Sequence, residues 1–183
     1  MPNLLMLPDG TTGTNEWSKS DAGETEESLV QSDDDDTSFV YETRRGHEIT
    51  FTMADPGVAE AAIDFDEDVT VRASIAAHYY NGGAGTVDMT IQITGTGITL
   101  GASTQTITVD DTYPVYHGSA TTNKAIGTAW DYAGLQNCQV KLDCTGVPAR
   151  FTALRVSYVY IRVDYTAAVS AAADNATFFG ANF

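Results

Sequence analysis

Acidic side chains are the first residues of this chain whose types and spacing suggest chemistry. From Asp64 to Asp68 the sequence reads Asp-Phe-Asp-Glu-Asp, which places carboxylates as in the first half of a calcium-binding loop. An EF-hand also needs glycine at position six and glutamate at position twelve, where this chain has Val69 and Ile75, so the sequence excludes an EF-hand. The default interpretation is a solvated acidic turn. A looser calcium site between loops is the alternative, and we expect no other cofactor.

A second acidic run extends from Asp33 to Asp36. Such a run usually faces water. The alternatives are capping of a strand, contact with a basic patch on a partner, or a cation shared with the acids of residues 64–68.

Histidine and nucleophile motifs give no sign of catalysis. The three histidines, His47, His78 and His117, stand neither at metal-ligand spacing nor beside a nucleophile motif. The chain has no Gly-x-Ser-x-Gly, no His-Glu-x-x-His and no phosphate-binding loop. Pairs of carboxylates can be chosen from any acidic chain, so they do not identify a glycosidase. We therefore expect a protein that is not an enzyme and has no catalytic residue.

Aromatic residues next to turns suggest one binding function. Tyr79 and Tyr80 precede a glycine-rich loop, and together with Trp130 and Tyr132 they could form a platform on which a glycan stacks. Aromatic residues at such positions also complete a core or line a subunit interface, which is the commoner role.

The charge of the chain is unevenly distributed. The 183 residues carry a formal net charge of −16, and residues 1–68 hold 18 of the 25 acids but 3 of the 9 bases. No basic stripe is present that could displace counterions from phosphates, so we expect neither nucleic acid nor an anionic membrane as a partner. The N-terminus lacks a basic leader and no apolar run reaches about 18 residues, so we expect no signal peptide and no membrane span.

The two cysteines are predicted to be buried free thiols. Cys138 and Cys144 are six residues apart on one alternating stretch. A single strand would separate them by about 20 Å, which is beyond the reach of a disulfide.

Residues that alternate between apolar and polar predict β-strands through the centre of the chain. Residues 69–77 and 87–93 alternate on either side of a glycine-rich loop, and we interpret them as an antiparallel hairpin with one buried face. Residues 154–165 are apolar or aromatic on both faces, which predicts a central or covered strand. About eight short strands without a long helix indicate an all-β, antiparallel two-sheet sandwich, jelly-roll-like as first choice and another Greek key as second.

The two ends of the chain are patterned less clearly than its middle. We expect an acidic N-terminal arm over 1–38, the β-sandwich over 39–165, and an extended tail over 166–183, whose alanines could instead form a short helix. The arms are expected to contact neighbouring subunits through apolar anchors, with Trp17 alternatively covering a sandwich edge. These anchors are Leu4, Leu5, Leu7 and Trp17 in front and Phe178, Phe179 and Phe183 behind.

Several segments resemble small β-sandwich structural proteins of tailed bacteriophages. The resemblance covers most of residues 17–165. It is carried by Trp17, the acidic entry 33–40, Gly127-Thr128-Ala129-Trp130, Leu135, the stretch 138–142 and the final strand 155–165. It implies a virion protein without catalytic residues, most simply a capsid decoration (cement) protein and otherwise a tail, neck or fibre module. It also implies a homo-oligomer, for which a trimer is plausible, that contacts other virion proteins such as the major capsid protein.

Two other classes of function are rivals to this interpretation. A sugar-binding host-recognition module would need exposed aromatic residues and would bind a glycan, with or without calcium. An enzyme acting on cell-wall or capsule polymers would need a particular carboxylate, and the sequence nominates none.

Overall fold

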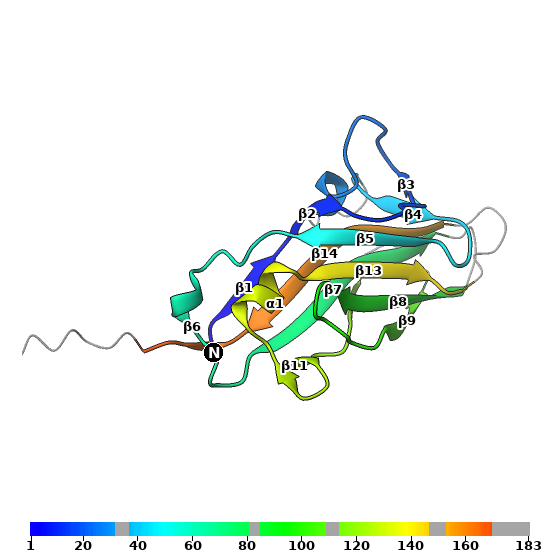
Figure 1. Ribbon diagram of the computed structural model, residues 1–183. Coiled ribbons are helices and arrows are strands. Elements are labelled where there is room, and N and C mark those ends of the chain that lie inside the picture. The colour runs from blue at the N-terminus through cyan, green and yellow to red at the C-terminus, as the bar shows by residue number, and fades with distance from the viewer. Residues whose placement is uncertain (32–36, 81–84, 109–113, 147–152, 170–183) are drawn as a thin grey trace, which may run out of the picture.

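Two antiparallel β-sheets pack face to face in the computed structural model (Figure 1). The structure describes residues 1–31, 37–80, 85–108, 114–146 and 153–169. The six-stranded sheet contains β10 (Val115–His117), β7 (Thr70–Tyr80), β14 (Ala153–Asp164), β4 (Val40–Glu42) and β3 (Ser18–Lys19) in that order, with β1 (Asn3–Met6) also paired to β14. The five-stranded sheet contains β2 (Pro8–Thr11), β5 (Glu48–Met53), β13 (Gln139–Cys144), β8 (Thr86–Thr94) and β9 (Ser103–Thr108) in that order. The all-β, antiparallel two-sheet sandwich predicted from the sequence is confirmed.

The chain passes repeatedly from one sheet to the other, as in a jelly roll. β1 and β2 lie in different sheets, and so do β4 and β5, β7 and β8, and β13 and β14. The predicted hairpin between residues 69–77 and 87–93 is therefore wrong, because β7 pairs with β14 and β10 whereas β8 pairs with β13 and β9. β8 buries one face as predicted, whereas β7 also buries Ser74 and Ala76 on its other face. Alternation cannot identify the partner strand, because a hairpin and a crossing between sheets produce the same pattern.

The core fills the space between the sheets with the inward-facing residue of each alternating pair. In β5, for example, Ile49, Phe51 and Met53 are buried while the intervening residues are partly exposed. β13 and β8 follow the same period of two. The alternation read from the sequence thus predicts the buried face of these strands correctly.

β14 occupies the centre of the six-stranded sheet. It pairs with β7 along one side and with β4 and β1 along the other. This placement confirms the prediction of a central strand, which was based on apolar and aromatic residues on both of its faces.

The N-terminal segment belongs to the sandwich, which corrects the expectation of an arm over residues 1–38. Leu4 and Met6 are buried while Leu5 between them is half-exposed, so β1 alternates although all three side chains are apolar. β1 pairs with β14 of the same chain and β2 pairs with β5. Burial of these side chains in the chain's own core, together with the hydrogen bonds of two sheets, means that the described residues 1–31 do not form a separate arm.

Trp17 also packs inside the molecule. Its ring is 5% exposed, and its Nε1–H donates a hydrogen bond to the His47 carbonyl (3.1 Å). This position agrees with the alternative interpretation of Trp17, in which its side chain covers an edge of the sandwich and does not contact a neighbouring subunit. The turn that follows contains η1 (Ser28–Val30), whose Leu29 and Val30 are buried.

Short elements complete the described structure. They are η2 (Glu60–Ala62), β6 (Ile63–Asp64) paired with β15 (Thr166–Ala167), the hairpin of β11 (Asn123–Ala125) and β12 (Thr128–Ala129), and α1 (Tyr132–Gln136). The pairing of β15 carries the folded region to Ala167, past the predicted boundary at residue 165. No helix in the described ranges is both long and apolar enough to cross a membrane.

Candidate functional site

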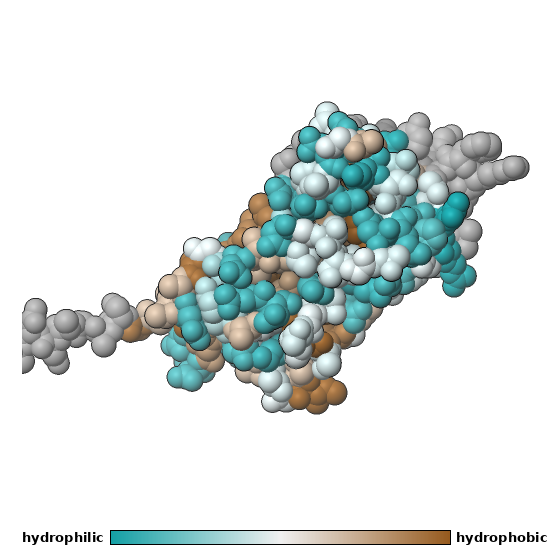
Figure 2. All heavy atoms as spheres, turned by 45° about the horizontal axis from the view of Figure 1, so that its top comes forward, coloured by the Kyte–Doolittle hydropathy of each residue, from teal (hydrophilic) through white to brown (hydrophobic). Residues whose placement is uncertain are grey.

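The outer faces of the two sheets differ sharply in composition. The outer face of the five-stranded sheet carries threonine, glutamine and charged side chains and has no aromatic residue among those described, as the strands β5, β13 and β8 illustrate. Figure 2 shows the side of the molecule that includes this sheet, and its surface is mainly teal and white. Polar side chains of this face pair with one another, as in the salt bridge between Lys141 and Glu48 and the hydrogen bond that Thr106 donates to Asp88. The composition is typical of a solvated surface.

The outer face of the six-stranded sheet is aromatic and cationic instead. We call it the arginine–tyrosine face after its aromatic and basic residues, which share the face with Leu5, Ser74 and Asp164. These residues are Tyr41, Arg72, His117, Arg155, Tyr158, Tyr160 and Arg162. The three arginines are a third of the nine lysines and arginines in a chain of net charge −16. The face therefore concentrates positive charge on an acidic protein.

A β-bulge in β14 places the tyrosines on this face. The register shifts between Val156, opposite Ala77, and Tyr158, opposite Ala76, so Ser157 is the extra residue and is fully buried. Without the bulge, Val156 and Tyr158 would point to the same side. The bulge reverses the alternation, which keeps Val156 in the core and turns Tyr158 outward.

One half of the face, next to β4, holds an aromatic and arginine cluster. The Arg155 guanidinium lies 4.5 Å from the centre of the Phe39 ring, and the Phe39 ring meets Tyr41 edge to face at 6.1 Å. These side chains line a hollow of about 290 Å³. Tyr158 and Tyr160, further along β14, lie 5.0 Å apart and connect this cluster with the other half of the face. Such rings offer flat apolar area with polar edges.

The other half of the face contains a polar groove of about 300 Å³, which we call the arginine groove. It is lined by Arg72, Ser74, His117, Tyr160, Arg162 and Asp164. Strand pairing brings them together in rows: Tyr160 lies opposite Ser74, Ser74 lies opposite His117, and Arg162 lies directly opposite Arg72. Three strands that are distant in sequence thus supply one site.

The charges in the arginine groove are only partly compensated. Arg162 donates to Asp164 through Nε (3.0 Å to Oδ1) and Nη2 (2.8 Å), and this hydrogen bonding raises the pKa of Arg162. No acid among the described residues pairs with Arg72, whose side chain is exposed. Like charges directly opposite each other destabilise a sheet. Among the described residues the groove therefore holds one arginine, Arg162, that is paired with an acid and one, Arg72, that is not.

The Ser74–His117 pair in the groove lacks the features of a catalytic nucleophile and base. Ser74 Oγ lies 2.8 Å from His117 Nδ1, but Ser74 is only 1% exposed. No carboxylate in the described portion of the chain is hydrogen-bonded to the His117 ring to orient it. The hydrogen bond holds the imidazole in place, and the arrangement is suited to binding.

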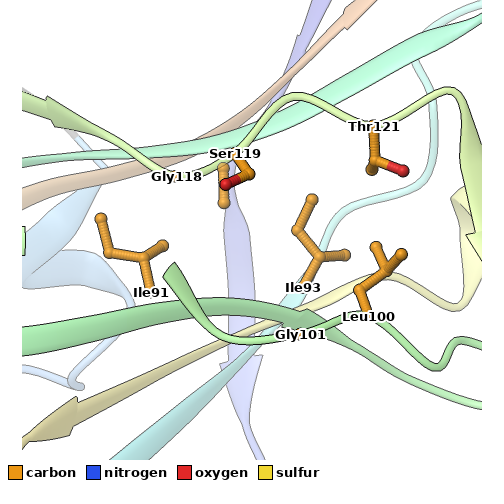
Figure 3. Close-up of a pocket in the computed structure, with 8 residues that line it drawn as sticks. Ile91, Ile93, Leu100, Gly101, Gly118, Ser119 and Thr121 are labelled. Carbon is orange, nitrogen blue, oxygen red and sulfur yellow. The ribbon is translucent and has the colours of Figure 1, made fainter. Parts of the chain in front are cut away.

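A smaller cavity opens between the sheets at the edge formed by β7 and β8. It measures about 110 Å³ and is lined by Ala73, Ile91, Ile93, Leu100, Gly101, Gly118, Ser119 and Thr121. Figure 3 shows Ile91, Ile93 and Leu100 on one side, with Ser119 and Thr121 across from them. Its lining has no charged or aromatic side chain, and its size matches a single small apolar group rather than a sugar.

The glycan platform, the less common of the two interpretations of these aromatic residues, is not formed around Trp130, and the side chains of Tyr79 and Tyr80 lie outside the described part of the structure. Trp130 is 2% exposed and its Nε1–H donates to the Thr121 carbonyl (3.2 Å), so its ring cannot stack on a ligand. The Tyr132 hydroxyl donates to the Val58 carbonyl (2.9 Å) and holds α1 against the preceding loop. Both residues complete the fold, which was the alternative considered for them.

The residues predicted as anchors for a partner differ in their exposure to solvent. Leu4 and Trp17 are buried and cannot contact a partner, Leu7 is partly buried, and Leu5 is 51% exposed on the outer side of β1. Phe178, Phe179 and Phe183 lie outside the described residues, as does the acidic run 33–36.

Neither the acidic turn at residues 64–68 nor the two cysteines forms a binding site among the described residues. Asp64 accepts a hydrogen bond from the Asp66 backbone (3.1 Å), and the described residues contain no group of three or more histidine, cysteine or acidic side chains placed to hold a metal ion. Cys138 and Cys144 are free and buried, as predicted. Burial raises the pKa of each thiol to about 12, with Glu42 and Asp143 contributing at Cys144.

Comparison with known proteins yields one distant structural likeness. No family model and no curated protein matches the chain. A solved structure, the CBM36-1 domain of a multidomain xylanase from the hindgut metagenome of Trinervitermes trinervoides, has 9% sequence identity and a TM-score of 0.43, covering 90% of this chain and 98% of that domain. At this distance the likeness does not indicate what the present chain binds.

Proposed function

We propose that this protein is a non-catalytic structural subunit of a virion and that its arginine–tyrosine face is the surface that docks onto neighbouring proteins. The observation that carries the proposal is the contrast between the two outer faces of the sandwich. One carries mainly threonine and other polar or charged side chains, and the other has arginines and partly exposed tyrosines, the residue types that concentrate at protein interfaces. The resemblance to bacteriophage sandwich proteins supplies the virion setting, with capsid decoration ahead of a tail, neck or fibre role.

The half of the face beside β4 explains how such docking would be stabilised. Arg155 is already held over the Phe39 ring, and Tyr158 and Tyr160 are held beside each other, so little side-chain freedom remains to be lost on binding. Covering this surface removes flat aromatic area from water. On a particle with many copies, weak contacts of this kind add up to firm attachment.

The experiment measures the number of copies per particle in purified virions by quantitative mass spectrometry. The double variant Arg155→Ala/Tyr160→Ala should lower the copy number at least tenfold. The matched control Thr90→Ala/Gln92→Ala, on the outer face of the five-stranded sheet, should leave it unchanged. Hundreds of wild-type copies indicate capsid decoration, and about three to eighteen indicate a tail, neck or fibre.

Two results would contradict the proposal. Absence of the wild-type chain from particles would remove the virion role, and equal copy numbers for both double variants would remove the docking role of this face.

A sugar-binding role is the second candidate, and the Tyr158–Tyr160 pair is the observation that favours it. These partly exposed rings lie 5.0 Å apart beside the groove, where a sugar could stack on them. Binding to host glycans that is lost in Tyr160→Ala but retained in Thr90→Ala would support this candidate over docking to proteins.

A further inference from the structure

The arginine groove is one of two oppositely charged features at different ends of the molecule. The second is the exposed loop between β3 and η1, residues 21–27, which stands out from the sandwich (Figure 1). We call it the acidic loop, and its four carboxylates are those of Asp21, Glu24, Glu26 and Glu27. Asp21 and Glu24 are exposed, and Glu26 and Glu27 are partly exposed.

Local hydrogen bonds give the acidic loop a defined shape. Asp21 Oδ1 accepts from the Gly23 backbone N–H (2.8 Å), and the Ser28 hydroxyl donates to Glu24 Oε2 (3.1 Å). Lys19 is the one base among the described residues that touches the loop, with its Nζ 3.9 Å from Glu26 Oε1 and hydrogen-bonded to the Glu24 carbonyl. Most of the negative charge of the loop therefore faces solvent.

The acidic loop cannot reach the arginine groove of its own chain. It leaves the sheet from β3, next to β4, and β4 meets β14 at Arg155. The groove is built around Arg162, seven positions further along β14. That spacing corresponds to about 20 Å along the strand. An acidic loop that fills the groove must belong to another molecule.

We infer that the arginine groove receives the acidic loop of a second copy of this chain. This inference rests on the proposed function, because it names the partner of one half of the docking face. Glutamate and aspartate carboxylates match the two-pronged donor geometry of Arg72, which has no acid partner among the described residues, and they relieve its repulsion from Arg162. Tyr160 and His117 border the groove and supply further hydrogen-bond donors.

The arrangement of loop and groove has a consequence for assembly. Each copy offers one loop and one groove, so a dimer with two reciprocal contacts and a closed ring both satisfy every loop and every groove. The attraction is between exposed charges and should weaken as salt is raised.

Sedimentation velocity of the purified full chain tests the inference at 50 and 500 mM NaCl over a range of protein concentrations. We expect reversible association at 50 mM NaCl that weakens at least tenfold at 500 mM. Arg72→Glu/Arg162→Glu should weaken association at least tenfold. Arg44→Glu/Arg45→Glu is the matched control, because it makes the same change of net charge at two exposed arginines of the β4–β5 turn and should associate like the wild type.

Variants of the loop keep the test independent of the folding of the sheet. Glu24→Gln/Glu27→Gln should weaken association without touching the groove, and Glu24→Arg/Glu27→Arg mixed with Arg72→Glu/Arg162→Glu should restore it. Circular dichroism verifies the fold of each variant, and Arg72→Gln/Arg162→Gln replaces the glutamate variant if that variant does not fold.

Three outcomes would overturn the inference. These are a wild-type chain that stays monomeric at 1 mM protein in 50 mM NaCl, association that is unaffected by both the groove and the loop variants, and binding of polyglucuronate in the groove without any self-association, which would assign the groove to an acidic glycan. If the chain does not self-associate through the groove, the proposed virion role is unaffected, since that role is measured by copy number in particles. A chain that self-associates as described but is absent from particles would remove the virion role alone.

Discussion

The substitution Met6→Ala tests whether β1 is a core strand of the sandwich. Met6 is 1% exposed and lies opposite Ile161 of the central strand β14. Replacing it by alanine removes three heavy atoms from a filled core, which costs about 2–5 kcal/mol of unfolding free energy. Leu5→Ala is the matched control on the same strand, because Leu5 is 51% exposed and points away from the core. Leu5→Ala should lower the free energy of unfolding by less than about 1 kcal/mol.

Equilibrium unfolding in urea, followed by tryptophan fluorescence, measures the difference. Trp17 and Trp130 are both buried, so their emission changes when the sandwich opens. With a denaturant slope of about 2 kcal/mol per molar urea, Met6→Ala should lower the midpoint by about 1–2.5 M and Leu5→Ala by less than about 0.5 M. Equal shifts for the two variants, or an unchanged midpoint for Met6→Ala, would show that β1 does not belong to the core and would restore the N-terminal arm.

Two further predictions concern a buried thiol and a turn. Burial raises the pKa of Cys138 to about 12, so a thiol reagent should not modify it at pH 8 in the native protein but should do so rapidly after unfolding. Above about pH 9 the unfolded thiol loses its proton while the folded one keeps it, so between pH 9 and 12 wild-type stability should fall more steeply than that of Cys138→Ala, by at most about 1.4 kcal/mol per pH unit in urea titrations. At the turn after β8, a Cβ on Gly95 (φ 139°) would overlap the backbone carbonyl of Asn137, whereas one on Gly97 (φ 76°) meets nothing within 4 Å. Gly95→Ala should therefore lower the melting temperature much more than Gly97→Ala, which should cost about 1 kcal/mol, and similar melting temperatures would contradict this turn geometry.

Alternation in the sequence identifies strands and their buried faces, but it does not identify their partners. Residues 69–77 and 87–93 were predicted correctly as strands, but the prediction of a single buried face holds only for 87–93, because Ser74 and Ala76 on the outer side of β7 are buried as well. The two strands were predicted wrongly as a pair, since each belongs to a different sheet. The pairing of a strand depends on contacts with residues far away in the chain, and its own pattern does not record them.

β1 was missed for a different physical reason. Leu4, Leu5 and Met6 are all apolar, so the sequence shows no alternation although the structure buries only the first and third of them. A short uniform apolar run is compatible with a strand, a buried helix segment or an anchor in a partner.

The arginine groove could not be predicted from the sequence. Arg72 and Arg162 are 90 positions apart and become neighbours only through the register of β7 and β14. The bulge at Ser157 adds a second obstacle, because it reverses which residues of β14 face outward. The available signal was that residues 154–165 are apolar or aromatic on both faces, which predicted a central or covered strand but named no site on it.

The pairing of β1 with β14 also determines when this protein can finish folding. Met6 of β1 pairs with Ile161 of β14, which the ribosome adds 155 positions later. The six-stranded sheet therefore has no complete centre until β14 has been synthesised, and β1 pairs with β14 by closing a loop that contains all the other strands of the two sheets. Until then the unpaired edges of a nascent chain are open to pairing with its neighbours on the same messenger. We thus expect the six-stranded sheet to form only after β14 has left the ribosome, and its yield to depend on how crowded the translating ribosomes are.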